Sequence, residues 1–254
     1  MILFHRFTPF VILALSGSGF SMLIVNPFGL WIPAVLCFLL IPVLFGRLLL
    51  WEFSRPAFWI FLGTPCFLLL SALMFFLLLE SESGAWILGT VVTLLLGLYA
   101  ENVFSFYHLP SNYQAYALEF LSLVCYVLSS FFFTGSAYMG QMFLELPFWI
   151  PALVVFFIVL GATSAVFWVS KIGFETGLLF AVSGSLIMTE LYIALALLPT
   201  SFVTNAAVFA VLWYLYLGIA RAHVLEDLGR GVLQRYLVTG CVLLLIIFGT
   251  ARWF

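Results

Sequence analysis

Long apolar runs, separated only by short polar turns, are the feature that most constrains the fold of this 254-residue chain. Only 7% of its residues are charged, against about a quarter in a typical soluble domain. The runs are longer than the roughly 10 residues of a transmembrane β-strand and close to the roughly 20 residues of a helix that crosses a bilayer. We therefore predict an all-α, polytopic integral membrane bundle, whose main partner is the lipid bilayer.

Turn residues divide the chain into nine predicted spans, which would form one helical domain over residues 1–254. The expected helices cover residues about 7–25, 28–49, 57–79, 85–107, 112–138, 148–169, 173–198, 201–221 and 236–251. The basic start of the first helix resembles a signal peptide, but another span follows it, so we keep it as a helix. A short amphipathic segment on the cytoplasmic surface is expected at about 222–235.

The basic residues predict that the N-terminus lies in the cytoplasm. With nine spans, all of the eight Lys and Arg residues except Arg252 fall on the side of the N-terminus. The chain would then be a multi-pass protein of the cell membrane, which is the cytoplasmic membrane if the protein is bacterial. The formal net charge is -2, so the chain has no excess of positive charge that would attract nucleic acid, and we expect no nucleic-acid partner.

Sequence signatures of enzymes and of metal or cofactor sites are missing. There is no HExxH, GxSxG or P-loop pattern, and the sole aspartate, Asp227, lies between spans. The three histidines, at positions 5, 108 and 223, lack the spacing of metal ligands. We predict no metal and no cofactor, and a role without catalysis is favoured over an enzyme.

Glutamates inside the predicted spans are the groups that could carry chemistry. An acidic side chain at the centre of a span costs about 2.5–3.5 kcal/mol even on lenient scales, so each should face the bundle interior or a partner. Glu101 and Glu119 would lie on adjacent helices at similar depth, ~9 Å below the cytoplasmic surface. Each belongs to a stripe of small or polar residues, so we expect both to face inward and to meet. Two close carboxylates would then share a proton.

These acids define the candidate proton, ion or substrate site. It comprises Glu101, Glu119, His108, Asn102 and Gln114. The alternative is that the glutamates only fasten the two helices, either protonated or paired with arginine.

A secondary candidate consists of Glu190 and Glu175. Glu190 follows Thr176 and Ser183 at seven-residue spacing, ~12 Å from the outer surface. We expect Glu190 to be neutral or paired with Asn205 or Tyr192.

Three functions remain open at this level. A membrane scaffold or complex subunit comes first, because polar groups are scarce and motifs are missing, and it predicts a stable membrane-protein partner. A small-molecule or ion carrier that uses the Glu101 and Glu119 pair, a possible transporter, comes second. A lipid-modifying membrane enzyme comes third.

Overall fold

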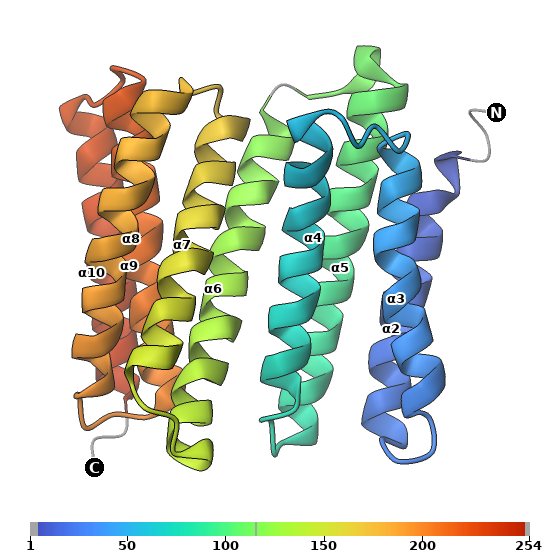
Figure 1. Cartoon of the computed structure of the whole chain (residues 1–254), viewed down its shortest axis with the longest axis horizontal. Helices are drawn as coiled ribbons and strands as arrows, with labels where there is room; N and C mark the ends of the chain where they lie inside the picture. The colour runs from blue at the N-terminus through green and yellow to red at the C-terminus, as the bar shows by residue number, and fades with distance from the viewer. Residues whose placement is uncertain (1–4, 115, 252–254) are drawn as a thin grey trace. The chain divides into compact units, whose positions relative to one another are not determined.

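Membrane-length helices make up the fold of the computed structural model, which describes residues 5–114 and 116–251 (Figure 1). In these two ranges nine helices are long and apolar enough to cross a membrane, and there is no β-strand. The predicted all-α, polytopic membrane fold is therefore confirmed. The protein is an integral membrane protein with many spans.

The helix boundaries lie close to the expected ones in most cases. The helices are α2 (Thr8–Val25), α3 (Trp31–Leu48), α4 (Pro56–Phe76), α5 (Glu82–His108), α6 (Ala117–Leu144), α7 (Trp149–Val169), α8 (Phe174–Ala196), α9 (Phe202–Val224) and α10 (Arg230–Thr250). Serine caps fix two of the starts: the Ser81 hydroxyl accepts a hydrogen bond from the Gly84 amide, and the Ser201 hydroxyl accepts one from the Thr204 amide.

Two connections differ from the sequence prediction. Before α6, Pro110 opens the 3-10 turn η1 (Pro110–Asn112), and the Leu118 amide donates to the Tyr113 hydroxyl, so α6 begins five residues later than expected. Residues 222–235 do not form a separate surface helix. Instead α9 continues to Val224, α10 begins at Arg230, and only residues 225–229 lie between them.

The helices form two compact units, one running to Ser129 and the other starting at Ser130. The boundary between the units lies inside α6, which is helical throughout. The first half of α6 belongs to the first unit, where Tyr126 is hydrogen-bonded to Thr64 of α4. The second half belongs to the second unit, where the Tyr138 hydroxyl donates to the carbonyl oxygen of Tyr192 in α8.

In the first unit, α2 packs along both α5 and α3 (Figure 1). Glycines permit the close approach of α2 and α5. A Cβ atom added at Gly89 would lie 3.0 Å from Cβ of Phe20, and one added at Gly97 would lie 2.7 Å from Cδ1 of Leu13. Small residues every four positions on α5 therefore form the seam against α2, as is common for helices that pack in a membrane.

In the second unit, the core lies between α7, α8 and α9. Trp213 of α9 is fully buried, and its indole Nε1–H donates to the Thr163 hydroxyl of α7 over 3.4 Å. The last helix, α10, packs on α9, and of its residues only Gly240 is buried. The other residues of α10 are half-buried or exposed, so α10 lies at the edge of its unit.

Candidate functional site

The first predicted site residues are Glu101 and Glu119, and the structure places them in different surroundings. Glu101 is exposed on α5, whereas Glu119 is half-buried in the first turn of α6. The expected inward face holds for Thr93 and Gly97, which lie against α2, but not for Glu101. Glu101 lies one turn after Gly97, which packs against Leu13 of α2, but its own side chain is exposed. A site shared by the two acids stays a prediction.

Asn102 and Gln114, proposed as neighbours of this pair, lie in two different settings. The Asn102 amide donates to the Leu98 carbonyl oxygen of its own helix over 2.8 Å. Gln114 is exposed in the connection before α6. Their roles in a site are likewise untested predictions.

His108, the last residue of α5, stacks on His5. The two ring centroids lie 4.7 Å apart with an angle of 16° between the rings, and Phe104 stacks on His108 as well. His108 Nε2 lies 3.3 Å from the Leu48 carbonyl oxygen at the end of α3. The sequence places both histidines at the same membrane face, but it does not pair them, because their contact depends on how α2 packs against α5.

The environment of His5 favours the neutral form of this imidazole. Burial, followed by the nearby His108 ring and the Arg47 guanidinium, lowers the pKa of His5 below its ordinary value. Its Nδ1 atom is buried and has no hydrogen-bond partner in the part of the chain that the structure describes. The stacked rings therefore hold the residue just ahead of α2 against the C-terminal end of α5.

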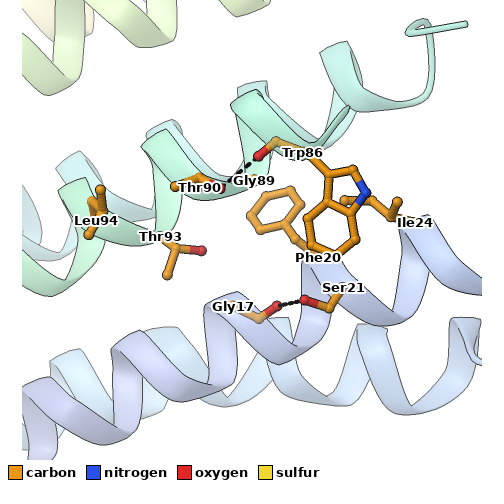
Figure 2. A pocket seen from close by; sticks show the side chains of 9 residues that line it. All are labelled: Gly17, Phe20, Ser21, Ile24, Trp86, Gly89, Thr90, Thr93 and Leu94. Atoms are coloured by element: carbon orange, nitrogen blue, oxygen red, sulfur yellow. Dashed lines mark hydrogen bonds between the residues drawn. The ribbon is translucent and has the colours of Figure 1, made fainter. Parts of the chain in front are cut away.

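A pocket of about 150 Å³ opens between α2 and α5, near the start of α5 (Figure 2). Its walls are formed by Gly17, Phe20, Ser21, Ile24, Trp86, Gly89, Thr90, Thr93 and Leu94. Two of its hydroxyls are bonded to their own helices: Ser21 donates to the Gly17 carbonyl oxygen over 2.7 Å and Thr90 donates to that of Trp86 over 2.8 Å. The walls are therefore largely apolar.

Thr93 is the exception in this pocket. Its side chain is 9% exposed, and its hydroxyl has no hydrogen-bond partner among the described residues. Figure 2 shows this hydroxyl projecting into the space between the two helices. A buried hydroxyl without a partner costs about 1–3 kcal/mol, so the pocket carries a polar group that is costly to the fold.

Replacing Thr93 with valine is expected to raise the free energy of unfolding by about 1 kcal/mol, because it removes an unsatisfied hydroxyl and keeps the shape of the side chain. The matched control is Thr64→Val in α4. The Thr64 hydroxyl is bonded to the Ile60 carbonyl oxygen at 3.0 Å and to the Tyr126 hydroxyl at 3.1 Å. That variant should lose about 0.6 kcal/mol, typical of hydrogen bonds between membrane helices.

Denaturation in mixed micelles, followed by circular dichroism, measures both variants. A loss of stability in Thr93→Val would show that the hydroxyl has a partner, such as a water molecule, in the protein as it exists in the membrane.

In the second unit, the secondary candidate residues lie on the outer face of α8. Glu190 and Glu175 are both exposed, as are Thr176 and Ser183 between them. The expected partners of Glu190 bond elsewhere. Asn205 accepts a hydrogen bond from the Thr200 hydroxyl, and the Tyr192 hydroxyl donates to Gln141 Oε1 over 3.2 Å. Glu190 thus lies within a membrane span, and the other helices of its own unit leave its side chain exposed.

A second pocket, of about 260 Å³, lies between α9 and α10. Tyr214, Val232, Arg235, Tyr236 and Thr239 line it. We refer to it as the Arg235 groove. Sequence reasoning missed it, because it placed Arg235 in a surface segment ahead of the last span. The signal that could have revealed it is the apolar sequence after Gly231, which continues the helix past the arginine.

Comparisons with protein-family models, with curated proteins and with solved structures find no match for this chain. The chemistry of its own residues is therefore the basis for assigning a function.

Proposed function

We propose that this protein is a subunit of a membrane complex, and that the outer face of α8 contacts a transmembrane helix of its partner. The observation that carries the proposal is the exposure of Glu190. This residue lies six positions before the end of α8 at Ala196, ~9 Å along the helix. An acid facing lipid within a span is costly, and a hydrogen-bond donor on a partner helix removes that cost.

The spacing of the polar residues supports a helix as the partner. Thr176, Ser183 and Glu190 recur every seven residues, which places them along one line of α8. A seven-residue repeat is the pattern by which two helices pack at a shallow angle. The opposite face of α8 is already used, since Gly177, Ala181 and other small residues there are buried within the unit.

The charge of Glu190 defines the chemistry of the partner. We expect a transmembrane helix that presents an arginine, lysine, asparagine or glutamine at the depth of Glu190. Such a residue would itself be costly in lipid, so the pair would stabilise both helices. The carrier alternative has less support, because neither pocket described above is lined by Glu101 or Glu119.

Site-specific photocrosslinking in native membranes tests the proposal. A photoreactive phenylalanine analogue replaces Leu186, which is 53% exposed between Ser183 and Glu190. We expect one protein adduct of defined mass, mapped by mass spectrometry to a span with a basic or amide residue, and its loss in Glu190→Ala. Glu190→Gln then reports whether the donor needs a charge or only an acceptor.

The matched control position is Leu153, which is 52% exposed on α7. The residues three and four positions away from it along the helix are all apolar. It should yield lipid adducts only. Lipid adducts alone at both positions, or a protein adduct at residue 186 that persists in Glu190→Ala, would refute an interface built on Glu190.

A further inference from the structure

We propose that the Arg235 groove binds the phosphate group of an anionic phospholipid. The groove brings together the side chains of Tyr214 from α9 and of Arg235, Tyr236 and Thr239 from α10. Among the described residues, neither the Arg235 guanidinium nor the three hydroxyls has an ionic or hydrogen-bond partner. One permanent cation and three hydroxyls that converge without protein partners are suited to an oxyanion.

The described residues that line the groove include no acidic side chain. A guanidinium there can pair with a phosphate through two parallel hydrogen bonds, which an ammonium cannot do with the same geometry. The tyrosine and threonine hydroxyls can donate to the remaining phosphate oxygens. The composition therefore favours an anion over a cation or an apolar ligand.

Close packing between α9 and α10 holds the groove in shape. The Tyr236 ring lies directly over Gly218 of α9, where any Cβ atom would collide with it. Leu215 of α9 occupies the corresponding space beside Gly240, where an added Cβ atom would lie 2.6 Å from Cδ1 of the leucine. The rings of Tyr214 and Tyr236 lie 5.6 Å apart. The groove thus exists before a ligand arrives, which lowers the cost of binding.

The position of the groove along α10 fits the headgroup of a lipid. Arg235 lies five residues after the start of the helix at Arg230, ~7.5 Å along its axis. This is the depth at which an arginine side chain reaches the headgroup region. Beyond the groove, α10 presents apolar side chains outward, including Val242 and Leu245, which are 49% and 73% exposed. The acyl chains of a bound lipid can lie along this face.

Lipid binding by the full-length protein in detergent tests this proposal. Native mass spectrometry would compare phosphatidylglycerol with phosphatidylcholine, whose headgroup carries no net charge. We expect bound phosphatidylglycerol on the unaltered protein, and at least a tenfold loss of affinity in Arg235→Gln, as for a hydrogen bond to a charged group. Arg235→Lys should recover only part of the affinity, because lysine lacks the planar fork of donors.

Arg230→Gln is the matched control, since it removes the same charge from the same helix outside the groove. Its affinity for phosphatidylglycerol should stay within twofold of the unaltered protein. Equal losses in both variants would show general attraction to anionic lipid and overturn the groove as a binding site. Binding of inorganic phosphate as tight as that of the lipid would overturn the assignment to a phospholipid. The thermal unfolding of each variant without lipid confirms that it is folded.

Discussion

Replacing Gly89 with leucine is expected to separate α2 from α5 and to lower the free energy of unfolding by about 3 kcal/mol, at the upper end for an overpacked core. The added side chain would meet Phe20 at Cβ and Cγ, 3.0 and 3.2 Å from the new Cβ atom. Atoms so near the backbone cannot rotate away. Phe20 is itself only 2% exposed, and its ring packs against the rings of Phe38 and Phe76, so a shift of Phe20 would disturb these contacts as well.

Denaturation in mixed micelles by sodium dodecyl sulfate, followed by circular dichroism, measures this loss. Gly63→Leu is the control, because Gly63 lies in a helix of the same unit and a Cβ atom there has no neighbour within 4 Å. It should change stability little, or raise it slightly, since leucine favours helices more than glycine does. Equal stability of the two variants would mean that α2 and α5 do not pack through Gly89.

Truncating Trp213 to alanine is expected to have a comparable effect on the second unit, a loss of about 3–5 kcal/mol. The indole is fully buried, so its removal leaves a large cavity between α7 and α9. Lost packing contacts account for this cost inside a membrane, where there is no transfer to water. Trp213→Phe removes the long hydrogen bond to Thr163 and less volume, and should lose less.

The control for Trp213 is Trp149→Ala. Trp149 is 57% exposed at the first position of α7, so its truncation should alter stability by less than about 0.5 kcal/mol. The same denaturation measurement applies. A loss at Trp149 equal to that at Trp213 would contradict the buried position of Trp213.

The sequence predicts the number and type of helices, because length and hydropathy alone determine whether a segment can cross a bilayer. It also marks Trp213 as unusual, since this tryptophan lies in the middle of a span rather than near an end. Its burial could have been inferred from that exception. The glycine and serine residues at positions 16–19 favour close helix packing in the same way, and a Cβ atom added at Gly19 would indeed lie 2.8 Å from the Phe38 ring.

The direction in which a side chain faces could not be predicted in the same way. In lipid, both faces of a helix are apolar, so hydropathy does not distinguish a buried face from an outer one. Glu101 illustrates this, because it recurs at four-residue spacing after Thr93 and Gly97, which are buried, and is nevertheless exposed. The stacking of His5 on His108, and the groove beside Arg235, depend in the same way on the register between helices.

The position of the unit boundary inside α6 has a consequence for how the protein is made. The ribosome delivers the chain from its N-terminus, so α2 to α5 enter the membrane before any of α6 exists. At that stage Thr64 lacks Tyr126, and the first unit is incomplete. Insertion of α6 supplies Tyr126 and, in the same step, the Tyr138 side chain that α8 will later need. The helix α6 thus completes the first unit and begins the second, and a chain that stops after α5 would lack the contact that Tyr126 makes with Thr64.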